Sequence, residues 1–239
     1  MRTREEGAAS GAVTFTQRHR RDQLVECAID AIAEVGYPRA SVAEVARRAA
    51  VSKGVITYHF PAKNDLIQAV IAAVIAEMGQ YLEPRLEAAD PAQYPERFIA
   101  PYLTTWTGYI QTHRRDVLAL VRIYNAFRDE SGHANPAFDV RANEITAVAE
   151  VLRRGQETGR LGSFDPRIMA AVMKAALDDL LIQYADNPGL DPEAYGAQLV
   201  ALFEAATRPD HGPATSSAAA GRQATAPHPS DPVTPEEEE

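Results

Sequence analysis

The chain of 239 residues contains a single cysteine and lacks the patterns of common catalytic and metal sites. Cys27 has no second cysteine for an internal disulfide, which fits a reducing compartment. There is no HExxH, no GxSxG, no glycine-rich phosphate loop and no Cys/His set at metal-binding spacing, and the six histidines are scattered. We therefore predict that the chain is not an enzyme and needs neither a cofactor nor a metal.

Long apolar runs are also missing. No run of about 18 or more apolar residues could span a bilayer, and the first residues lack the apolar core of a secretory signal. We expect a cytoplasmic protein without a membrane partner. Convincing alternating strands are absent too, so the predicted fold class is all-α.

Charge is unevenly distributed along the chain. The net charge is −9, yet residues 16–66 carry eight Lys and Arg against six Asp and Glu, a difference of +2. The remaining chain is acidic and ends in "PEEEE". A mildly basic segment on an acidic body can orient a protein toward a polyanion, although this signal is weak alone.

The two ends of the chain contain few large apolar residues. Residues 1–15 and the Pro/Ala-rich acidic tail at 208–239 cannot bury enough surface to offset the entropy of ordering. We predict a disordered arm and a disordered tail, and an interaction role for the tail stays an alternative.

Between these ends the pattern is helical. An apolar stripe over 24–35 stops at Gly36, as is typical of a left-handed helix C-cap. Ser41 and Ser52 are candidate N-caps of two short helices, and Pro61 ends the second. Further helices are predicted at about 63–80, 95–112, 114–128, 135–159, 166–187 and 192–207.

The two short helices have the layout of a helix-turn-helix. "SVAEVARRA" is the bracing helix, "AVS" the turn and "KGVITYHF" the helix that enters the major groove of DNA. On a helical wheel Ile56 and Phe60 face the core, while the other side is polar and aromatic.

The outward residues are of types that contact DNA. The hydroxyls of Ser41 and Thr57 can bond phosphates, and Lys53 can reach a phosphate or a guanine edge. Gly54 allows close backbone approach, and Val55 can meet a thymine methyl group. The predicted DNA-binding residues are Ser41, Arg47, Ser52, Lys53, Gly54, Val55, Thr57, Tyr58, His59 and Lys63.

A structural interpretation of the same residues stays open on composition alone. Tyr58 and His59 can be satisfied groups at the edge of a core, and Arg47 with Arg48 can be a solvated face.

The stretch from about Arg20 to Val70 resembles the DNA-binding domain of TetR-family transcriptional regulators. The resemblance rests on "LVECAIDAIAEVGY", "SVAEVARRAAVSKGVITYHF" and "KNDLIQAV", which agree with the family spacing over nearly fifty residues. Thr57 departs from the pattern, because many members have a second aromatic there.

The resemblance implies an N-terminal head at 16–66 and a helical ligand-binding and dimerisation domain at 67–207. It implies a homodimer whose recognition helices enter successive major grooves of a palindromic operator, about 34–36 Å apart. Family members usually repress, and a small-molecule effector usually releases the DNA. A sequence-indifferent architectural DNA protein is the alternative, which the net charge of −9 disfavours.

Aromatic residues in the C-terminal half suggest a pocket between helices. The predicted pocket residues are Tyr102, Trp106, Tyr109, His113, Tyr124, Phe127, Met173 and Asp178. Asp178 among aromatics favours a cationic ligand, whereas His113 and Arg128 favour an acidic one, and a solvent or dimer-rim position for Asp178 is the alternative. A plain hydrophobic core is the alternative for the aromatics.

Broad apolar faces on the last two helices suggest burial against a second subunit. The residues predicted for the dimer interface are Val172, Leu180, Tyr184, Leu199, Leu202 and Phe203. The helix at about 63–80 joins the head to the body and is the predicted lever between ligand and DNA.

Overall fold

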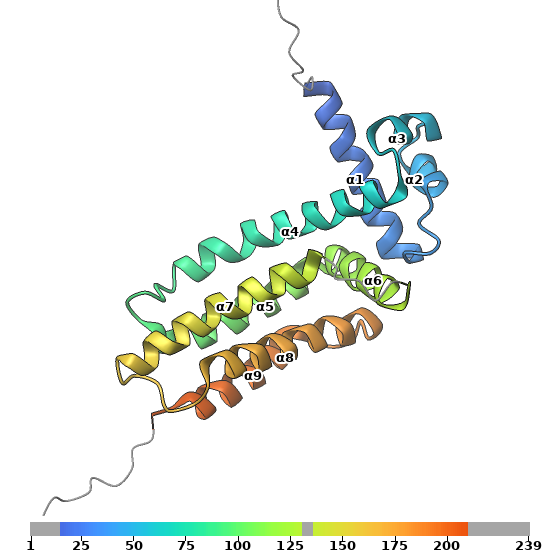
Figure 1. Ribbon diagram of the computed structural model, residues 1–239. Helices are drawn as coiled ribbons and strands as arrows, with labels where there is room; N and C mark the ends of the chain where they lie inside the picture. The colour runs from blue at the N-terminus through green and yellow to red at the C-terminus, as the bar shows by residue number, and fades with distance from the viewer. Residues whose placement is uncertain (1–14, 131–135, 210–239) are drawn as a thin grey trace, which may run out of the picture. The chain divides into compact units, whose positions relative to one another are not determined.

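The computed structural model describes residues 15–130 and 136–209, which contain helices and no strand (Figure 1). The predicted arm and tail lie almost wholly outside the described residues. The elements are α1 (Phe15–Val35), α2 (Val42–Arg48), α3 (Lys53–His59), α4 (Lys63–Glu87), the 3₁₀ turn η1 (Pro95–Arg97), α5 (Ile99–Thr112), α6 (Arg114–Glu130), α7 (Pro136–Glu157), α8 (Pro166–Asp186) and α9 (Pro192–Thr207). The predicted all-α fold is confirmed.

Two hydrophobic clusters hold these helices together. The first packs α1, α2 and α3, which we call the head, against the N-terminal half of α4 and one side of α6. The second fills the body, formed by α5 to α9 with the C-terminal half of α4. The predicted division at residue 66 stays a prediction, because α4 contributes Val74 to the first cluster and Leu82 to the second.

Capping residues set the ends of the head helices. Ser41 Oγ accepts a hydrogen bond of 3.2 Å from the Glu44 amide and so caps α2, as predicted. Ser52 stands at the N-cap of α3, but its side chain makes no capping bond. Gly36 ends α1 with φ +83°, in the left-handed region that favours glycine.

Helix α4 extends further than the sequence pattern predicts. It runs to Glu87 and includes Pro84, whereas the apolar periodicity ends near Met78. By length and composition this helix could cross a membrane. Within the fold, however, it packs against α1, α5 and α6, as a core helix does.

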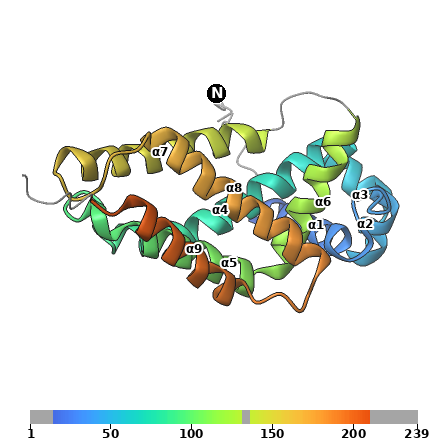
Figure 2. The same ribbon diagram turned by 90° about the horizontal axis from the view of Figure 1, so that it is seen from below.

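The body helices pair along their lengths. Figure 2 shows α9 beside α5, and α8 packs against α7. The α5–α9 pair approaches closely at Gly196, where a Cβ atom would lie 2.7 Å from the side chain of Thr107. A larger residue here would require Thr107 or one of the two helices to shift.

Gly36→Ala should lower the free energy of unfolding by about 1 kcal/mol or more, because the left-handed backbone is strained for any residue with a Cβ atom. Gly79→Ala is the matched control. Gly79 lies inside α4 with only the flexible end of Glu83 near its absent Cβ, so alanine should raise that free energy by up to about 1 kcal/mol. Denaturant unfolding measures both, and equal signs for the two variants would contradict the assignment.

Candidate nucleic-acid interface and ligand cavity

Helix α3 has one buried side and one open side. Ile56 and Phe60 are fully buried in the head cluster, as predicted. The exposed residues Lys53, Gly54, Thr57 and Tyr58 are spaced so that they share one face of the helix. Among the described helices α3 packs chiefly against α2, so its outer face is open to a partner.

Tyr58 is a surface residue. Its side chain is 71% exposed, and its hydroxyl accepts a 3.3 Å hydrogen bond from Gln17 Nε2 of α1. His59 is half-buried and meets the Tyr58 ring edge-on at 5.1 Å. The core-edge interpretation therefore does not hold for Tyr58, whereas His59 has both an internal contact and some exposure.

Nothing in the described part of the chain requires a glycine at position 54. Its φ is not positive, and a Cβ atom added there would lie 3.6 Å from Ser52 Oγ, an ordinary contact. Glycine is unfavourable inside a helix by about 1 kcal/mol relative to alanine. Packing within the described residues therefore does not account for glycine at this position.

The predicted hydroxyl donors Thr57, Ser41 and Ser52 differ in their present hydrogen bonds and positions. Thr57 donates to the carbonyl groups of Lys53 and Gly54 at 3.2 and 3.1 Å, so it must rotate to donate to a phosphate. Ser41 and Ser52 are exposed at the N-termini of α2 and α3. Val55 is half-buried beside the open face.

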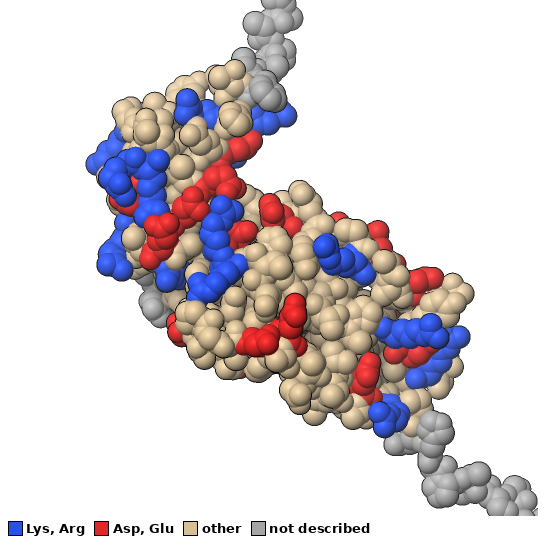
Figure 3. All heavy atoms as spheres, turned by 180° about the vertical axis from the view of Figure 1, so that it is seen from behind, with Lys and Arg blue, Asp and Glu red and all other residues tan. Residues whose placement is uncertain are grey.

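Basic side chains gather on the head in the face that Figure 3 shows, with acidic side chains among them. Arg47 is exposed and forms two hydrogen bonds with Glu44, at 2.9 and 2.7 Å. Arg48 is largely buried and joins Glu44 to Glu34 of α1, so its role is structural. Hydrogen bonds from Arg47 and Arg48 lower the pKa of Glu44 to about 2.

Lys63 is held by the head itself. Its Nζ donates to the Tyr37 carbonyl group at 3.3 Å and lies 4.3 Å from the centre of the Tyr37 ring. This contact fixes the start of α4 on the turn that follows α1. A phosphate contact by Lys63 would be additional to this structural role.

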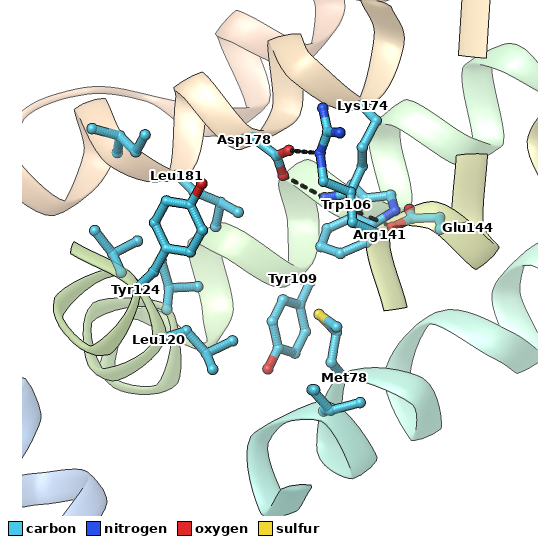
Figure 4. Close-up of a pocket in the computed structure, with 14 residues that line it drawn as sticks. Met78, Trp106, Tyr109, Leu120, Tyr124, Arg141, Glu144, Lys174, Asp178 and Leu181 are labelled. Atoms are coloured by element: carbon cyan, nitrogen blue, oxygen red, sulfur yellow. Dashed lines mark hydrogen bonds and ion pairs between the residues drawn. The ribbon is translucent and has the colours of Figure 1, made fainter. Parts of the chain in front are cut away.

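The body contains a cavity of about 220 Å³. Side chains of α4, α5, α6, α7 and α8 form its wall (Figure 4). The lining residues are Ile75, Met78, Trp106, Tyr109, Val117, Leu120, Val121, Tyr124, Arg141, Glu144, Lys174, Asp178, Leu181 and Ile182. Most of this surface is apolar.

Four charged groups stand together on one side of the cavity (Figure 4). Asp178 forms ion pairs with Arg141 Nε at 2.9 Å and with Lys174 Nζ at 2.5 Å. Glu144 lies 3.7 Å from Lys174 Nζ and accepts a 2.8 Å hydrogen bond from the Tyr102 hydroxyl. Burial and the nearby Glu144 raise the pKa of Tyr102, so its hydroxyl stays protonated.

Two buried donors in the cavity wall lack a hydrogen-bond partner among the described residues. These are Trp106 Nε1 and the Tyr109 hydroxyl. Both side chains are at least nine-tenths buried, with exposed fractions of 3% and 1%. Burial, followed by the charges of Asp116 and Glu77, raises the pKa of Tyr109, which is therefore a neutral phenol.

Comparison with known proteins decides the family of the head. Residues 24–70 match the sequence model of "Bacterial regulatory proteins, tetR family". A segment of 69 residues is 41% identical to the "HTH-type transcriptional regulator BetI" of Serratia proteamaculans, covering 29% of this chain and 35% of that protein. The match thus spans only about a third of the relative. Residues 24–70 thus have a TetR-family sequence.

Solved structures extend the likeness to the fold of the whole described region. A TetR-family regulator from Rhodococcus sp. aligns with a TM-score of 0.68 at 21% identity, over 78% of this chain and 98% of that one. A TetR regulator from Haloarcula marismortui gives 0.69 at 13% identity, over 80% and 99%. The family is one of regulatory proteins, in agreement with our prediction that the chain is not an enzyme.

The cavity includes half of the residues predicted for a pocket: Trp106, Tyr109, Tyr124 and Asp178. Tyr102 lies behind the wall, bonded to Glu144, and His113 stacks on Tyr109 with ring centres 4.4 Å apart. Met173 is fully buried in the body cluster and does not line the cavity. The side chains of Phe127 and Arg128 lie outside the described residues.

Sequence reasoning missed the polar partners Arg141, Glu144 and Lys174. One signal was present: Lys174 and Asp178 are four residues apart in an apolar helix, a spacing that allows an ion pair. The contribution of α7 carried no such signal, because it depends on how α7 packs on α8.

The residues predicted for a dimer interface divide into two groups. Leu180, Tyr184, Leu199 and Phe203 are buried in the body cluster of the single chain, which accounts for their apolar character. Val172 and Leu202 are 50% and 61% exposed. Ile168 on α8 is exposed as well, so α8 and α9 carry an open apolar face, whereas the exposed Ile182 lines the cavity.

Tyr109→Phe should raise the free energy of unfolding by about 1 kcal/mol, because it removes a buried hydroxyl without a described partner. Tyr102→Phe is the matched control and should lower it by about 1–2 kcal/mol, since its hydroxyl bonds a carboxylate. Chemical denaturation checks both. A loss at Tyr109 as large as that at Tyr102 would show that the Tyr109 hydroxyl is bonded.

Proposed function

We propose that this TetR-family chain is a sequence-specific transcriptional regulator, a cytoplasmic homodimeric repressor that leaves a palindromic operator when a small molecule binds its body. The open face of α3 is the observation that carries the proposal. It presents Lys53, Gly54, Thr57 and Tyr58 outward from a helix that the head cluster fixes by its other side. A helix in this setting is shaped to enter a major groove.

Direct readout of DNA needs a helix whose outer side chains are exposed to the groove. Lys53 is exposed at the first turn of α3, where backbone amides also favour an anion. Gly54 leaves room for the groove wall. The net charge of −9 disfavours the alternative of an architectural protein, whose binding would rest on phosphate neutralisation alone.

A second copy of the chain is the proposed partner of α8 and α9. Ile168 and Val172 lie one helical turn apart on α8, and Leu202 is exposed on the neighbouring α9. Two copies of such a helix pair would form a four-helix interface and cover this apolar surface. The dimer would then present two recognition helices to a two-fold symmetric operator.

Helices α4 and α6 are the proposed connection between cavity and head. On α6, Leu120 and Tyr124 line the cavity, while Leu118 and Ile123 pack in the head cluster. On α4, Ile75 lines the cavity near Val74, which is in the head cluster. A ligand that favours a different setting of these helices would shift the spacing of the two heads in the dimer.

Lys53→Ala should weaken operator binding and reduce the slope of log affinity against log salt by about one, the effect of one lost phosphate contact. The operator is obtained first, by sequencing the pool of random DNA that the wild-type chain retains. Arg97→Ala is the control, because this exposed arginine lies in the body. Loss of affinity with Arg97→Ala alone, or an unenriched pool, would contradict the assignment of α3.

Gly54→Ala tests whether this position matters for operator binding rather than for folding. The variant should be more stable by up to about 1 kcal/mol, because alanine favours the helix and meets no clash. Its operator affinity should nevertheless fall, since the added methyl group holds the backbone away from the groove. Unchanged affinity would show that the backbone at Gly54 does not approach DNA.

Val172→Glu or Leu202→Glu should convert a dimer to the 26.0 kDa monomer, because each places a charge on the proposed apolar interface. Sedimentation velocity measures the mass. Thr146→Glu on the exposed side of α7 is the control and should leave the dimer intact. A wild-type chain that sediments as a monomer would refute the interface.

A further inference from the structure

We propose that the cavity binds an uncharged, mostly apolar molecule that carries a hydrogen-bond acceptor such as a carbonyl or ether oxygen. This inference rests on the proposed function, since it names the class of effector for the same cavity. It follows from three features of the wall: compensated charges, an occupied cation site and two unpaired buried donors.

The charges in the wall neutralise one another. Arg141 and Lys174 supply two positive charges, Glu144 and Asp178 supply two negative ones, and each has an opposite partner within 4 Å. A charged ligand would lose its hydration on entry and find no uncompensated group among these four to replace it. Arg141, with 39% of its side chain exposed, is the most open of the four and lies nearest to solvent.

The Trp106 ring in the cavity wall already has a cation against it. Lys174 Nζ lies 4.6 Å from the centre of the Trp106 ring, at the distance of a cation–π contact. Lys174 is only 6% exposed and is fixed by two carboxylates, so it cannot move aside without weakening the pairing of Asp178 and Glu144. A ligand cation at the Trp106 ring would have to approach this ammonium group closely, which is repulsive.

The unpaired donors select for an acceptor. Trp106 Nε1–H can only donate, and the Tyr109 hydroxyl has no partner among the described residues. Each buried donor without a partner carries a cost that one hydrogen bond from a ligand would remove. Less than 1 Å² of either donor atom is accessible in this conformation, so a ligand oxygen would reach one of them only after a shift of a wall side chain. The hydrogen bond would then add affinity and orient the molecule.

The size of the cavity suits a small ring compound. At about 220 Å³ it is roughly one and a half times the engineered cavity of about 150 Å³ that holds benzene. A ring with a short substituent fits this space in the conformation described.

Four probes of nearly equal shape test the class: acetophenone, isopropylbenzene, benzoate and benzamidine. They share a phenyl ring and a three-atom branched substituent, and they differ in charge and in the presence of a carbonyl acceptor. Each is titrated into the full-length chain labelled with ¹⁵N. Trp106 is the only tryptophan, so one indole N–H signal reports directly from the cavity wall.

We expect acetophenone and isopropylbenzene to shift this signal saturably, and benzoate and benzamidine to bind at least tenfold more weakly than acetophenone. Only acetophenone should change the chemical shift of the indole proton in the direction of a new hydrogen bond. Likewise, only acetophenone should lose affinity if the Tyr109 hydroxyl is removed. Benzoate or benzamidine binding as tightly as acetophenone would overturn the uncharged class. Failure of all four probes to shift the signal would overturn the assignment of this cavity.

Tyr109→Phe tests which donor in the cavity wall bonds the carbonyl group of acetophenone. If acetophenone bonds the Tyr109 hydroxyl, its affinity should fall about fivefold, while that of isopropylbenzene should not fall. If it bonds Trp106 instead, the variant keeps the hydrogen-bond shift of the indole proton. Equal losses for both probes, with no hydrogen-bond shift for acetophenone, would overturn the acceptor.

A second measurement tests the proposed function separately from the class of ligand. Operator affinity is measured with each probe at saturation of the indole signal. Probes that bind as expected but leave operator affinity unchanged would contradict ligand release and leave the ligand class standing. Release by benzamidine alone would support the regulator and overturn the uncharged class.

Discussion

The structure depends on the packing of α6 between the head and the body. Leu118, Ala119 and Ile123 of this helix are buried with the head helices, while Val117 and Val121 are buried with the body. Arg122 of the same helix adds hydrogen bonds of 3.2 and 2.6 Å to the carbonyl groups of Ile32 and Ala33. The Ile32 carbonyl also accepts a hydrogen bond from the Gly36 amide at 3.0 Å, whereas the Ala33 carbonyl lies where a helix runs out of its own amide donors, so α6 helps to complete the end of α1.

The same helix faces the cavity, whose opposite wall is polar although the body around it is apolar. Lys174 is almost fully buried, which is unfavourable unless the charge is paired. Asp178, Glu144 and the Trp106 ring together supply that pairing from three helices. The ion pairs of the polar wall therefore require α5, α7 and α8 to keep their relative positions. Helices α4 and α6 line the cavity mainly with apolar side chains, whose contacts with a ligand are not directional.

The open face of α3 contrasts with the polar wall of the cavity, whose residues are fixed by ion pairs with one another. Its residues contribute little to the stability of the head: Tyr58 is exposed, and Gly54 is less favourable for a helix than alanine. Residue types that the fold does not require are an indication of contact with a partner. The head cluster holds this helix through Ile56 and Phe60, which leaves the outer face unconstrained by packing.

Local patterns in the sequence determined the helices, the caps at Ser41 and Gly36, and the buried side of α3, because these features depend on neighbours a few residues apart. The family resemblance over about Arg20 to Val70 was likewise carried by local spacing. The tertiary structure decided which apolar residues of α8 and α9 are core: Leu180 and Phe203 are buried in the body cluster with residues of α5 and α7, whereas Val172 and Leu202 face outward. It also brought Arg141 and Glu144 to Asp178 and Lys174, since an ion pair between helices is set by packing that sequence spacing does not encode.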